Sequence, residues 1–188
     1  MIENSEFLFE CTDHALRFAF QYSSQQSPSS PMLKAMVGPT GTGKGLSGLD
    51  GAGQAGMILD VVNRMSREER DVITARFGQV THECPCCHQQ TSTQDWRSAV
   101  SNLSMCDELH DLARDVRIAI VQKVLCRRVV EVAGLGSQYG MNERTLRNRI
   151  KKFRDRIFKV ERRALCQLDT FFAATGLIPP QDGVEKVA

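Results

Sequence analysis

Apolar residues recur every three or four positions along most of this chain of 188 residues. This spacing places them on one face of an α-helix, whereas a half-buried strand would alternate at every second residue. No convincing alternating run and no internal repeat is found, so the sequence predicts an all-α fold. The predicted helices span residues 4–22, 52–65, 66–77, 94–105 and, with breaks near Gly134, Gly136 and Gly140, about 109–175.

Local signals set several boundaries of these helices. Ser66 and Glu69 have the spacing of a capping box, which predicts that a new helix starts there. Gly176 is typical of a residue that ends a helix. Residues rich in Ser, Pro and Gly predict a mobile loop after the first helix. The chain therefore divides into an N-terminal helix (1–22), this loop (23–51), a helical region with a cysteine-containing loop (52–110), a helix-turn-helix region (111–178) and a tail (179–188).

The stretch from Gly38 to Gly45 is close to a phosphate-binding loop. Such a loop needs Ser or Thr after its lysine to hold magnesium, and it runs from a buried strand into a helix. Here Gly45 follows Lys44, and no α/β pattern surrounds them. We therefore predict no nucleotide cofactor. Neither this stretch nor the cysteine cluster shows a nucleophile paired with a base, so we predict that the protein is not an enzyme.

Residues 129–150 fit a helix-turn-helix, in which a tight glycine turn joins a short helix to a second one. Gly140 can take the left-handed conformation at the turn, and Asn142 suits the N-cap of the second helix. Gly136 stands where alanine is usual, although glycine inside a helix costs about 1 kcal/mol relative to alanine. Two ordinary core helices joined by a glycine turn are the alternative. The expected core anchors are Leu135, Tyr139, Met141, Leu146 and Ile150.

The second helix of this motif carries most of the positive charge. The formal net charge of the whole chain is only +2, yet residues 143–163 contain ten Lys/Arg and three Asp/Glu. Over residues 111–163 the balance is +9, and over the rest of the chain it is −7. So strong a local bias predicts double-stranded DNA as a partner, and a solvated charged face is the alternative.

The start of this helix supplies the candidate DNA-binding residues. Arginine can read guanine and asparagine can read adenine when the N-terminus of a helix enters the major groove. Lys151 and Lys152 lie further along the helix and are expected to contact phosphate. The predicted DNA-binding residues are Asn142, Glu143, Arg144, Arg147, Asn148, Lys151 and Lys152.

An apolar seam runs along the same helix in alternating steps of four and three residues. This is the spacing of a coiled-coil seam. Packing into the core of the protein is the expected use of the seam, and self-association is the alternative. The seam consists of Leu146, Ile150, Phe153, Ile157, Val160 and Ala164.

The chain has seven cysteines, and three of them crowd into residues 84–87. An odd number of cysteines without an export signal indicates reduced thiols and a cytoplasmic protein. No apolar stretch is long enough for a membrane span, so no membrane partner is expected. Zinc usually takes four Cys or His ligands in two pairs. The predicted zinc ligands are Cys84, Cys87, Cys106 and His110, and a redox pair or plain buried thiols are the alternatives.

Several segments, taken in their order along the chain, point to a family. They are ALRFAF (15–20), GLDGAGQAGMI (48–58), SREERDVITARF (66–77), the cysteine cluster, DWRSAV (95–100) and the helix-turn-helix. In this order the chain resembles the phage and prophage Q-type antiterminators, which include the AlpA-like lysis regulators of pseudomonads. It departs from them in a shorter cysteine cluster and in the added stretch from Gly38 to Gly45.

The resemblance implies a transcription regulator rather than an enzyme. Such a protein binds DNA near a promoter, loads onto RNA polymerase and promotes readthrough of terminators. RNA polymerase is therefore an expected partner, with the N-terminal helical region as a candidate surface for it. A conventional helix-turn-helix activator or a sigma-like factor, acting at initiation, is the alternative.

Overall fold

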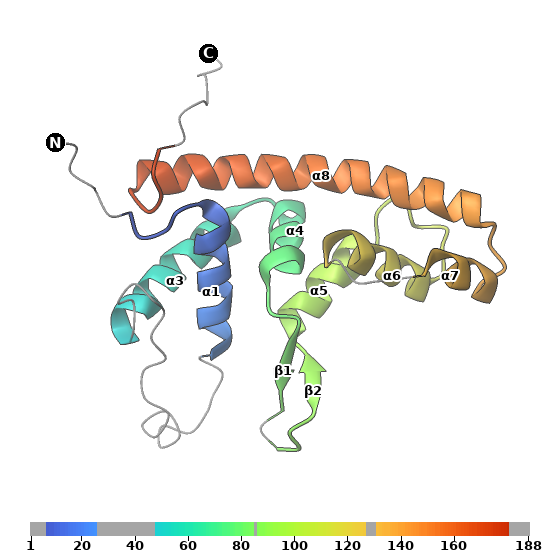
Figure 1. Cartoon of the computed structure of the whole chain (residues 1–188), viewed down its shortest axis with the longest axis horizontal. Coiled ribbons are helices and arrows are strands. Elements are labelled where there is room, and N and C mark those ends of the chain that lie inside the picture. Colours follow the sequence, from blue (N-terminus) through green and yellow to red (C-terminus); the bar gives the residue numbers. More distant parts are fainter. Residues whose placement is uncertain (1–6, 26–47, 85, 127–130, 181–188) are drawn as a thin grey trace, which may run out of the picture. The chain divides into compact units, whose positions relative to one another are not determined.

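The computed structural model describes residues 7–25, 48–84, 86–126 and 131–180. This part of the chain is mostly helical, in agreement with the predicted class, and contains one two-stranded sheet (Figure 1). The helices are α1 (Thr12–Gln25), α3 (Gly48–Arg64), α4 (Arg67–Phe77), α5 (Gln94–Leu103), α6 (Arg114–Leu125), α7 (Val132–Gln138) and α8 (Glu143–Ala174). The strands are β1 (Thr81–Glu83) and β2 (Gln90–Ser92).

The chain forms two compact units. One consists of residues 1–64 and 165–188, and the other of residues 65–164. The long helix α8 contributes to both, since the division falls between Ala164 and Leu165. The boundary predicted at residues 110 and 111 falls inside the second unit and does not coincide with this division.

In the first unit, α1 packs against α3. Leu16 and Ile58 are fully buried on these helices, and Phe172 is fully buried on the last turns of α8. The segment before α1 is tied down by a hydrogen bond in which the Phe9 backbone N–H donates to the Leu177 carbonyl over 3.0 Å. The Phe9 ring also lies 5.2 Å from the Phe18 ring, centroid to centroid.

Those contacts explain why the predicted helix over 4–22 is wrong in its bounds. Residues 7–11 are not helical, and α1 runs from Thr12 to Gln25. The helical spacing of apolar residues continues through Phe9, but the Phe9 backbone N–H donates to Leu177 instead of to a residue of the same helix. A spacing pattern does not reveal such a long-range hydrogen bond. The predicted loop over 23–51 is likewise too long, because α3 already begins at Gly48. The phosphate-loop-like stretch, residues 38–45, lies outside the described residues.

In the second unit, α4 packs against α5, and both contact α6. The N-terminal part of α8 covers this group (Figure 1). The predicted capping box is confirmed, since Ser66 Oγ accepts from the Glu69 backbone N–H while the Glu69 carboxylate accepts from the Ser66 backbone N–H. The core contains, among others, Val72, Trp96, Val100, Leu109, Val116, Ile120, Leu146, Phe153 and Ile157.

The cysteine cluster does not lie in a plain loop, as the sequence predicted, but at the tip of a β-hairpin. β1 pairs antiparallel with β2, with Thr81 opposite Ser92 and Glu83 opposite Gln90. Each strand has three residues, and none of the six is buried. Segments this short and polar carry no detectable alternation, so the hairpin escapes a search for period two.

In the C-terminal half, one predicted break is confirmed, because the turn at Gly140 separates α7 from α8. The break predicted near Gly134 and Gly136 is wrong, since both glycines lie inside α7. Two further breaks were not predicted: α6 ends before Cys126, and a non-helical stretch over residues 104–113 separates α5 from α6. Single glycines inside a helix are tolerated at modest cost, so their position is a weak guide to helix ends.

Candidate nucleic-acid interface and cysteine cluster

A tight turn joins α7 to α8. Gly140 has a φ of 64°, in the left-handed region that the sequence predicted for it. The Met141 N–H donates to the Gly136 carbonyl over 2.8 Å. Asn142 Oδ1 accepts from the Arg144 backbone N–H over 2.9 Å, which confirms Asn142 as the N-cap of α8. The turn therefore fixes where α8 starts and which residues form its first exposed turn.

The glycine at position 136 has a packing reason. A Cβ atom built there would lie 3.0 Å from the Met141 carbonyl oxygen, which is tighter than ordinary van der Waals contact. The absent side chain lets α7 approach the start of α8 closely. The cost of glycine in α7 is therefore offset by the hydrogen bond that this approach allows between Met141 and Gly136.

The predicted anchors pack as expected. Leu146 is fully buried, and Leu135, Tyr139, Met141 and Ile150 are partly buried against the same core. Further along the seam, Phe153, Ile157 and Ala164 are fully buried. The seam of α8 therefore packs inside this protein, as expected.

Within the second unit, three arginines on α8 contact acids of α4 and of the stretch after α5, and they recur every seven residues. Arg149 Nη2 lies 2.7 Å from Asp111 Oδ2, and Arg163 Nε donates to Glu69 Oε1 over 2.6 Å. Arg156 lies between two carboxylates, with Glu68 at 2.6 Å and Glu108 at 3.2 Å. Seven residues are close to two helical turns, so the three share one face. We call Arg149, Arg156 and Arg163 the inward arginine row.

Of the acids that face this row, Glu69 shows the effect in its pKa. The pKa of Glu69 is lowered, first by the hydrogen bond from the Ser66 side chain and then by Arg163, against an opposing effect of burial. The Glu69 side chain is only 5% exposed, so its charge depends on these partners. The inward row thus holds α8 against α4 and the segment after α5.

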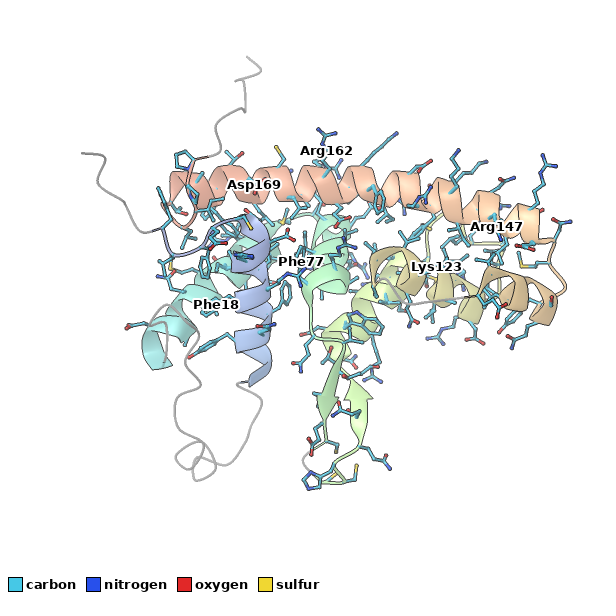
Figure 2. All side chains as sticks on the ribbon, viewed as in Figure 1. Phe18, Phe77, Lys123, Arg147, Arg162 and Asp169 are labelled. Atoms are coloured by element: carbon cyan, nitrogen blue, oxygen red, sulfur yellow. The ribbon has the colours of Figure 1, made fainter. Side chains whose placement is uncertain are left out.

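The remaining cations of this stretch lie on the opposite, solvent-facing side of α8. Figure 2 shows one of them, Arg162, on the side of α8 that faces away from α4. Two acids lie among them: Glu143, whose Oε1 accepts from Arg147 Nε over 2.8 Å, and Asp155, at 3.9 Å from Arg154. We call this surface the outward face, and its exposed cations are Arg144, Arg147, Lys151, Lys152, Arg154, Lys159 and Arg162.

All seven predicted DNA-binding residues, from Asn142 to Lys152, are exposed on the first turns of α8. The sequence count of ten cations over residues 143–163 did not separate the two faces of the helix. The sequence nevertheless contains a sign of the two faces, because residues 149, 156 and 163 flank the apolar seam at a constant heptad position. Seven of the ten cations lie exposed on the outward face.

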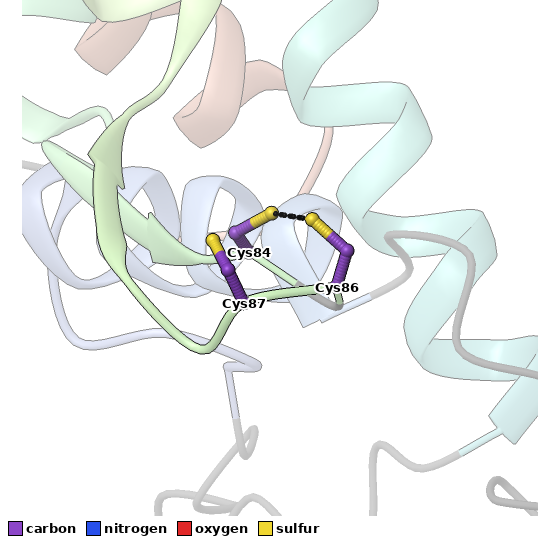
Figure 3. A group of neighbouring side chains, drawn as sticks. All are labelled: Cys84, Cys86 and Cys87. Carbon is purple, nitrogen blue, oxygen red and sulfur yellow. Dashed lines mark hydrogen bonds between the residues drawn. The ribbon is translucent and has the colours of Figure 1, made fainter.

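The hairpin tip gathers three thiols. Their sulfur atoms all lie within 4.8 Å of one another, and Cys84 Sγ is 2.9 Å from Cys86 Sγ (Figure 3). The tip is closed by two backbone bonds of 2.9 Å, from Cys84 to Gln89 and from His88 to Cys84. Such a group of Cys84, Cys86 and Cys87 could hold a metal ion.

The thiols differ in acidity. The pKa of Cys84 is lowered to about 7, mainly because the Cys86 thiol hydrogen-bonds to it, with backbone N–H groups of Cys86 and Cys87 adding to the effect. The pKa of Cys86 is raised by the same contact. The thiolate is the form that binds metals and attacks disulfides, and Cys84 provides it near neutral pH.

The predicted ligand set is thus brought together only in part. Cys84 and Cys87 belong to the group, Cys86 joins them, and neither Cys106 nor His110 is part of it. Cys106 and His110 lie in turns after the end of α5, so they do not share a helix face. His110 Nδ1 instead lies 2.6 Å from the Asp107 carbonyl oxygen. The requirement for two ligand pairs misdirected the prediction away from Cys86.

The two histidines beside the cluster have other contacts. His88 Nδ1 lies 2.5 Å from Glu83 Oε1, and His82 Nε2 lies 3.2 Å from Thr91 Oγ1. Both contacts are made across or at the base of the hairpin tip. The structure therefore places sulfur alone in the candidate metal group among the described residues.

Comparison with known proteins places no family on this chain. No family model matches it, and no curated protein matches it. Among the described residues, none of the helices combines the length and the apolar character needed to cross a bilayer.

Proposed function

We propose that this protein is a DNA-binding transcription regulator and that α7, the turn and α8 form a helix-turn-helix. One observation carries the proposal: seven exposed cations share the outward face of a single helix, while the inward arginines are neutralised within the protein. A surface with this excess of one sign attracts a polyanion, and duplex DNA carries one negative charge per about 1.7 Å of its axis.

The start of α8 supports a division of labour on DNA. Arg144, Asn148 and the backbone turn at Asn142 lie at the N-terminus, where such helices approach base edges. Lys151 and Lys152 lie two turns further along and suit phosphate contacts. Arg147 is already engaged by Glu143, so reading a base would require it to exchange that carboxylate for a guanine edge.

The proposed regulator acts as a Q-type antiterminator that loads onto RNA polymerase near a promoter and promotes terminator readthrough. The support for this step is the resemblance in the order of its segments. The acidic balance outside residues 111–163, −7 in all, suits a protein partner better than a nucleic acid. A conventional activator or sigma-like factor would use the same helix-turn-helix but would change initiation alone.

DNA binding is tested first with random and promoter-bearing duplexes at several salt concentrations. Phosphate neutralisation predicts that the logarithm of the affinity falls linearly with that of the salt concentration, by about 0.9 per phosphate contacted. Arg147→Ala should lower specific affinity by about 1–3 kcal/mol if it reads a base. An affinity that does not change with salt contradicts the proposal.

The step on polymerase is tested by run-off transcription across a terminator and by retention on RNA polymerase with and without promoter DNA. Increased readthrough from a template that carries the binding site supports antitermination. Increased initiation with unchanged readthrough identifies the alternative, an activator or sigma-like factor. No change in either rules out action through polymerase.

We also propose that the hairpin tip holds a zinc ion through Cys84, Cys86 and Cys87. Three sulfurs within 4.8 Å and a thiolate at Cys84 near neutral pH suit this ion. Zinc bound there would stabilise a hairpin whose strands have only three residues each.

Zinc quantitation should give about one equivalent of zinc per chain, and about 0.2 equivalents or less contradicts the site. Cys86→Ser should lose the zinc, whereas Cys106→Ser should keep it.

A further inference from the structure

A phenylalanine interrupts the cations of the outward face. The Phe158 side chain on α8 is 47% exposed, although most large apolar side chains on this helix are buried. One other exposed phenylalanine lies on α8, namely Phe171 at 45%. A single exposed apolar residue is ordinary on a protein surface, so the surroundings of each ring decide what it can bind.

Those surroundings differ sharply. Arg154 lies four residues before Phe158 and Arg162 four residues after it, positions that adjoin it on the helix surface. The positions three residues away are Asp155, which lies 3.9 Å from Arg154, and Glu161, which is paired with Arg76. Lys159 lies next to it in the chain, and all three cations are exposed. The corresponding neighbours of Phe171 are Gln167 and Thr175, which carry no charge. An apolar protein surface that covered Phe158 would have to desolvate the cations around it. A polyanion with flat apolar groups would instead contact the Phe158 ring and pair with those cations.

Phe158 also lies far from the proposed base-reading end of the helix. Fifteen residues separate it from Glu143, which is ~22 Å along a helix. The major groove is about 12 Å wide, and base edges are read by the first residues of the inserted helix. At the position of Phe158 a duplex would present phosphates and sugars, which offer a phenyl ring nothing to stack on. Unpaired bases offer a flat π-face between phosphates.

We infer that the distal part of the outward face, Arg154 to Arg162, binds single-stranded DNA that adjoins the bound duplex, with Phe158 stacking on an unpaired base. This inference rests on the proposed DNA-binding function. Arg154, Lys159 and Arg162 neutralise the phosphates on either side of that base. The preferred substrate is therefore a junction between duplex and single strand, such as the edge of a melted region.

The test uses the full chain and three labelled DNAs of random sequence: a blunt duplex, the same duplex with a thymidine extension, and oligothymidylate alone. Phe158→Leu keeps an apolar side chain but removes the ring, and Phe171→Leu is the matched control on the same helix. Phe158→Leu should weaken binding to the extended duplex and to oligothymidylate by about 5- to 150-fold. Binding to the blunt duplex should change less than about 2-fold, and Phe171→Leu should change none of the three.

A second variant reports on stacking directly. Trp96 is the single tryptophan and is only 3% exposed, so Phe158→Trp adds a surface fluorophore. Its fluorescence should be quenched by oligothymidylate, and binding should stay at or above that of the unaltered protein. Absence of quenching at saturating DNA overturns the stacking.

The outcomes separate this inference from the proposed function. Binding to blunt duplex with no loss in Phe158→Leu on any DNA overturns the inference and leaves the regulator proposal intact. Phe158-dependent binding to oligothymidylate without duplex binding supports the single-strand surface and contradicts the helix-turn-helix proposal. Tighter binding to oligouridylate than to oligothymidylate overturns DNA as the ligand of this surface. If Phe158→Leu loses retention on RNA polymerase while its binding to all three DNAs is unchanged, the ring contacts protein and its nucleic-acid role is overturned.

Discussion

The two faces of α8 use the same residue types for different purposes. The inward arginine row meets Asp111, Glu68, Glu108 and Glu69, so its charge is balanced inside the second unit. The outward face has seven cations against three in the inward row, and only the acids Glu143 and Asp155 lie among them. A count of charge along the sequence therefore overstates what a partner can meet, and the face of the helix decides whether an arginine stabilises the fold or binds a ligand.

The largest expected effect comes from reversing charge on the outward face. Lys151→Glu combined with Lys152→Glu should lower DNA affinity about 100-fold or more, because two phosphate contacts become repulsive. The melting temperature should stay unchanged, since neither lysine is engaged in the core. Arg64→Glu on α3 is the control for a reversal elsewhere on the surface. Equal losses in both variants, measured by fluorescence anisotropy, would show that the outward face is not a specific site.

Truncating one arginine from each face sharpens the contrast. Arg156→Met should lower the free energy of unfolding by about 1–2 kcal/mol, because Glu68 and Glu108 lose a partner at a partly buried site. DNA affinity should not change in that variant. Arg162→Met should have the opposite effects. It should weaken binding to the duplex with the thymidine extension by several-fold, and it should leave the free energy of unfolding in denaturant unchanged. A loss of stability in Arg162→Met would erase the distinction.

Much of the helical fold can be predicted from the sequence, and the exceptions have physical causes. The capping box of α4 and the N-cap at Asn142 depend on side chains two or three residues away, so local sequence suffices. The start of α1 depends on a hydrogen bond between Phe9 and Leu177, which are distant in sequence. The hairpin has strands too short to show a period.

The candidate sites were predictable to different degrees for the same reason. The predicted DNA-binding residues lie at the N-cap and on the first turns of a single helix, so their exposure on one surface follows from periodicity. The group of three thiols depends on how the tip of the hairpin folds, and spacing rules written for two ligand pairs favoured Cys106 and His110 over Cys86. The inward row needs acids from two other segments, α4 and the stretch after α5, which are distant from α8 in the sequence.

The inward row should also depend on pH. The pKa of Glu69 is lowered by Ser66 and Arg163, so its carboxylate contributes stability that is complete above its unfolded value of 4.5. This contribution is lost as the pH falls through the folded pKa. The free energy of unfolding, measured with urea, should fall between pH 7 and about pH 3 in both proteins. The fall should be smaller in Glu69→Gln than in the unaltered protein, because the variant has no carboxylate to protonate at this position. An identical pH dependence would mean that Glu69 does not titrate with folding.

The smallest expected effect is a gain. Glu143→Gln removes the carboxylate that engages Arg147 and leaves the outward face one charge more positive. Affinity for random duplex should rise about 2- to 5-fold and fall more steeply with salt. Stability should change by less than about 0.5 kcal/mol, because this i,i+4 pair is exposed. A loss of affinity would instead show that the carboxylate positions Arg147 for DNA.

The heptad recurrence of Arg149, Arg156 and Arg163 sets the rotational phase of α8. A turn of the helix by one residue, about 100°, would bring Ile150, Ile157 and Ala164 against the carboxylates and move Leu146 out of the core. Carboxylates left without partners beside apolar groups are costly. The angular orientation of this part of α8 is therefore fixed by charge as well as by packing, and a cation on residues 143–164 has a defined direction relative to the rest of the second unit.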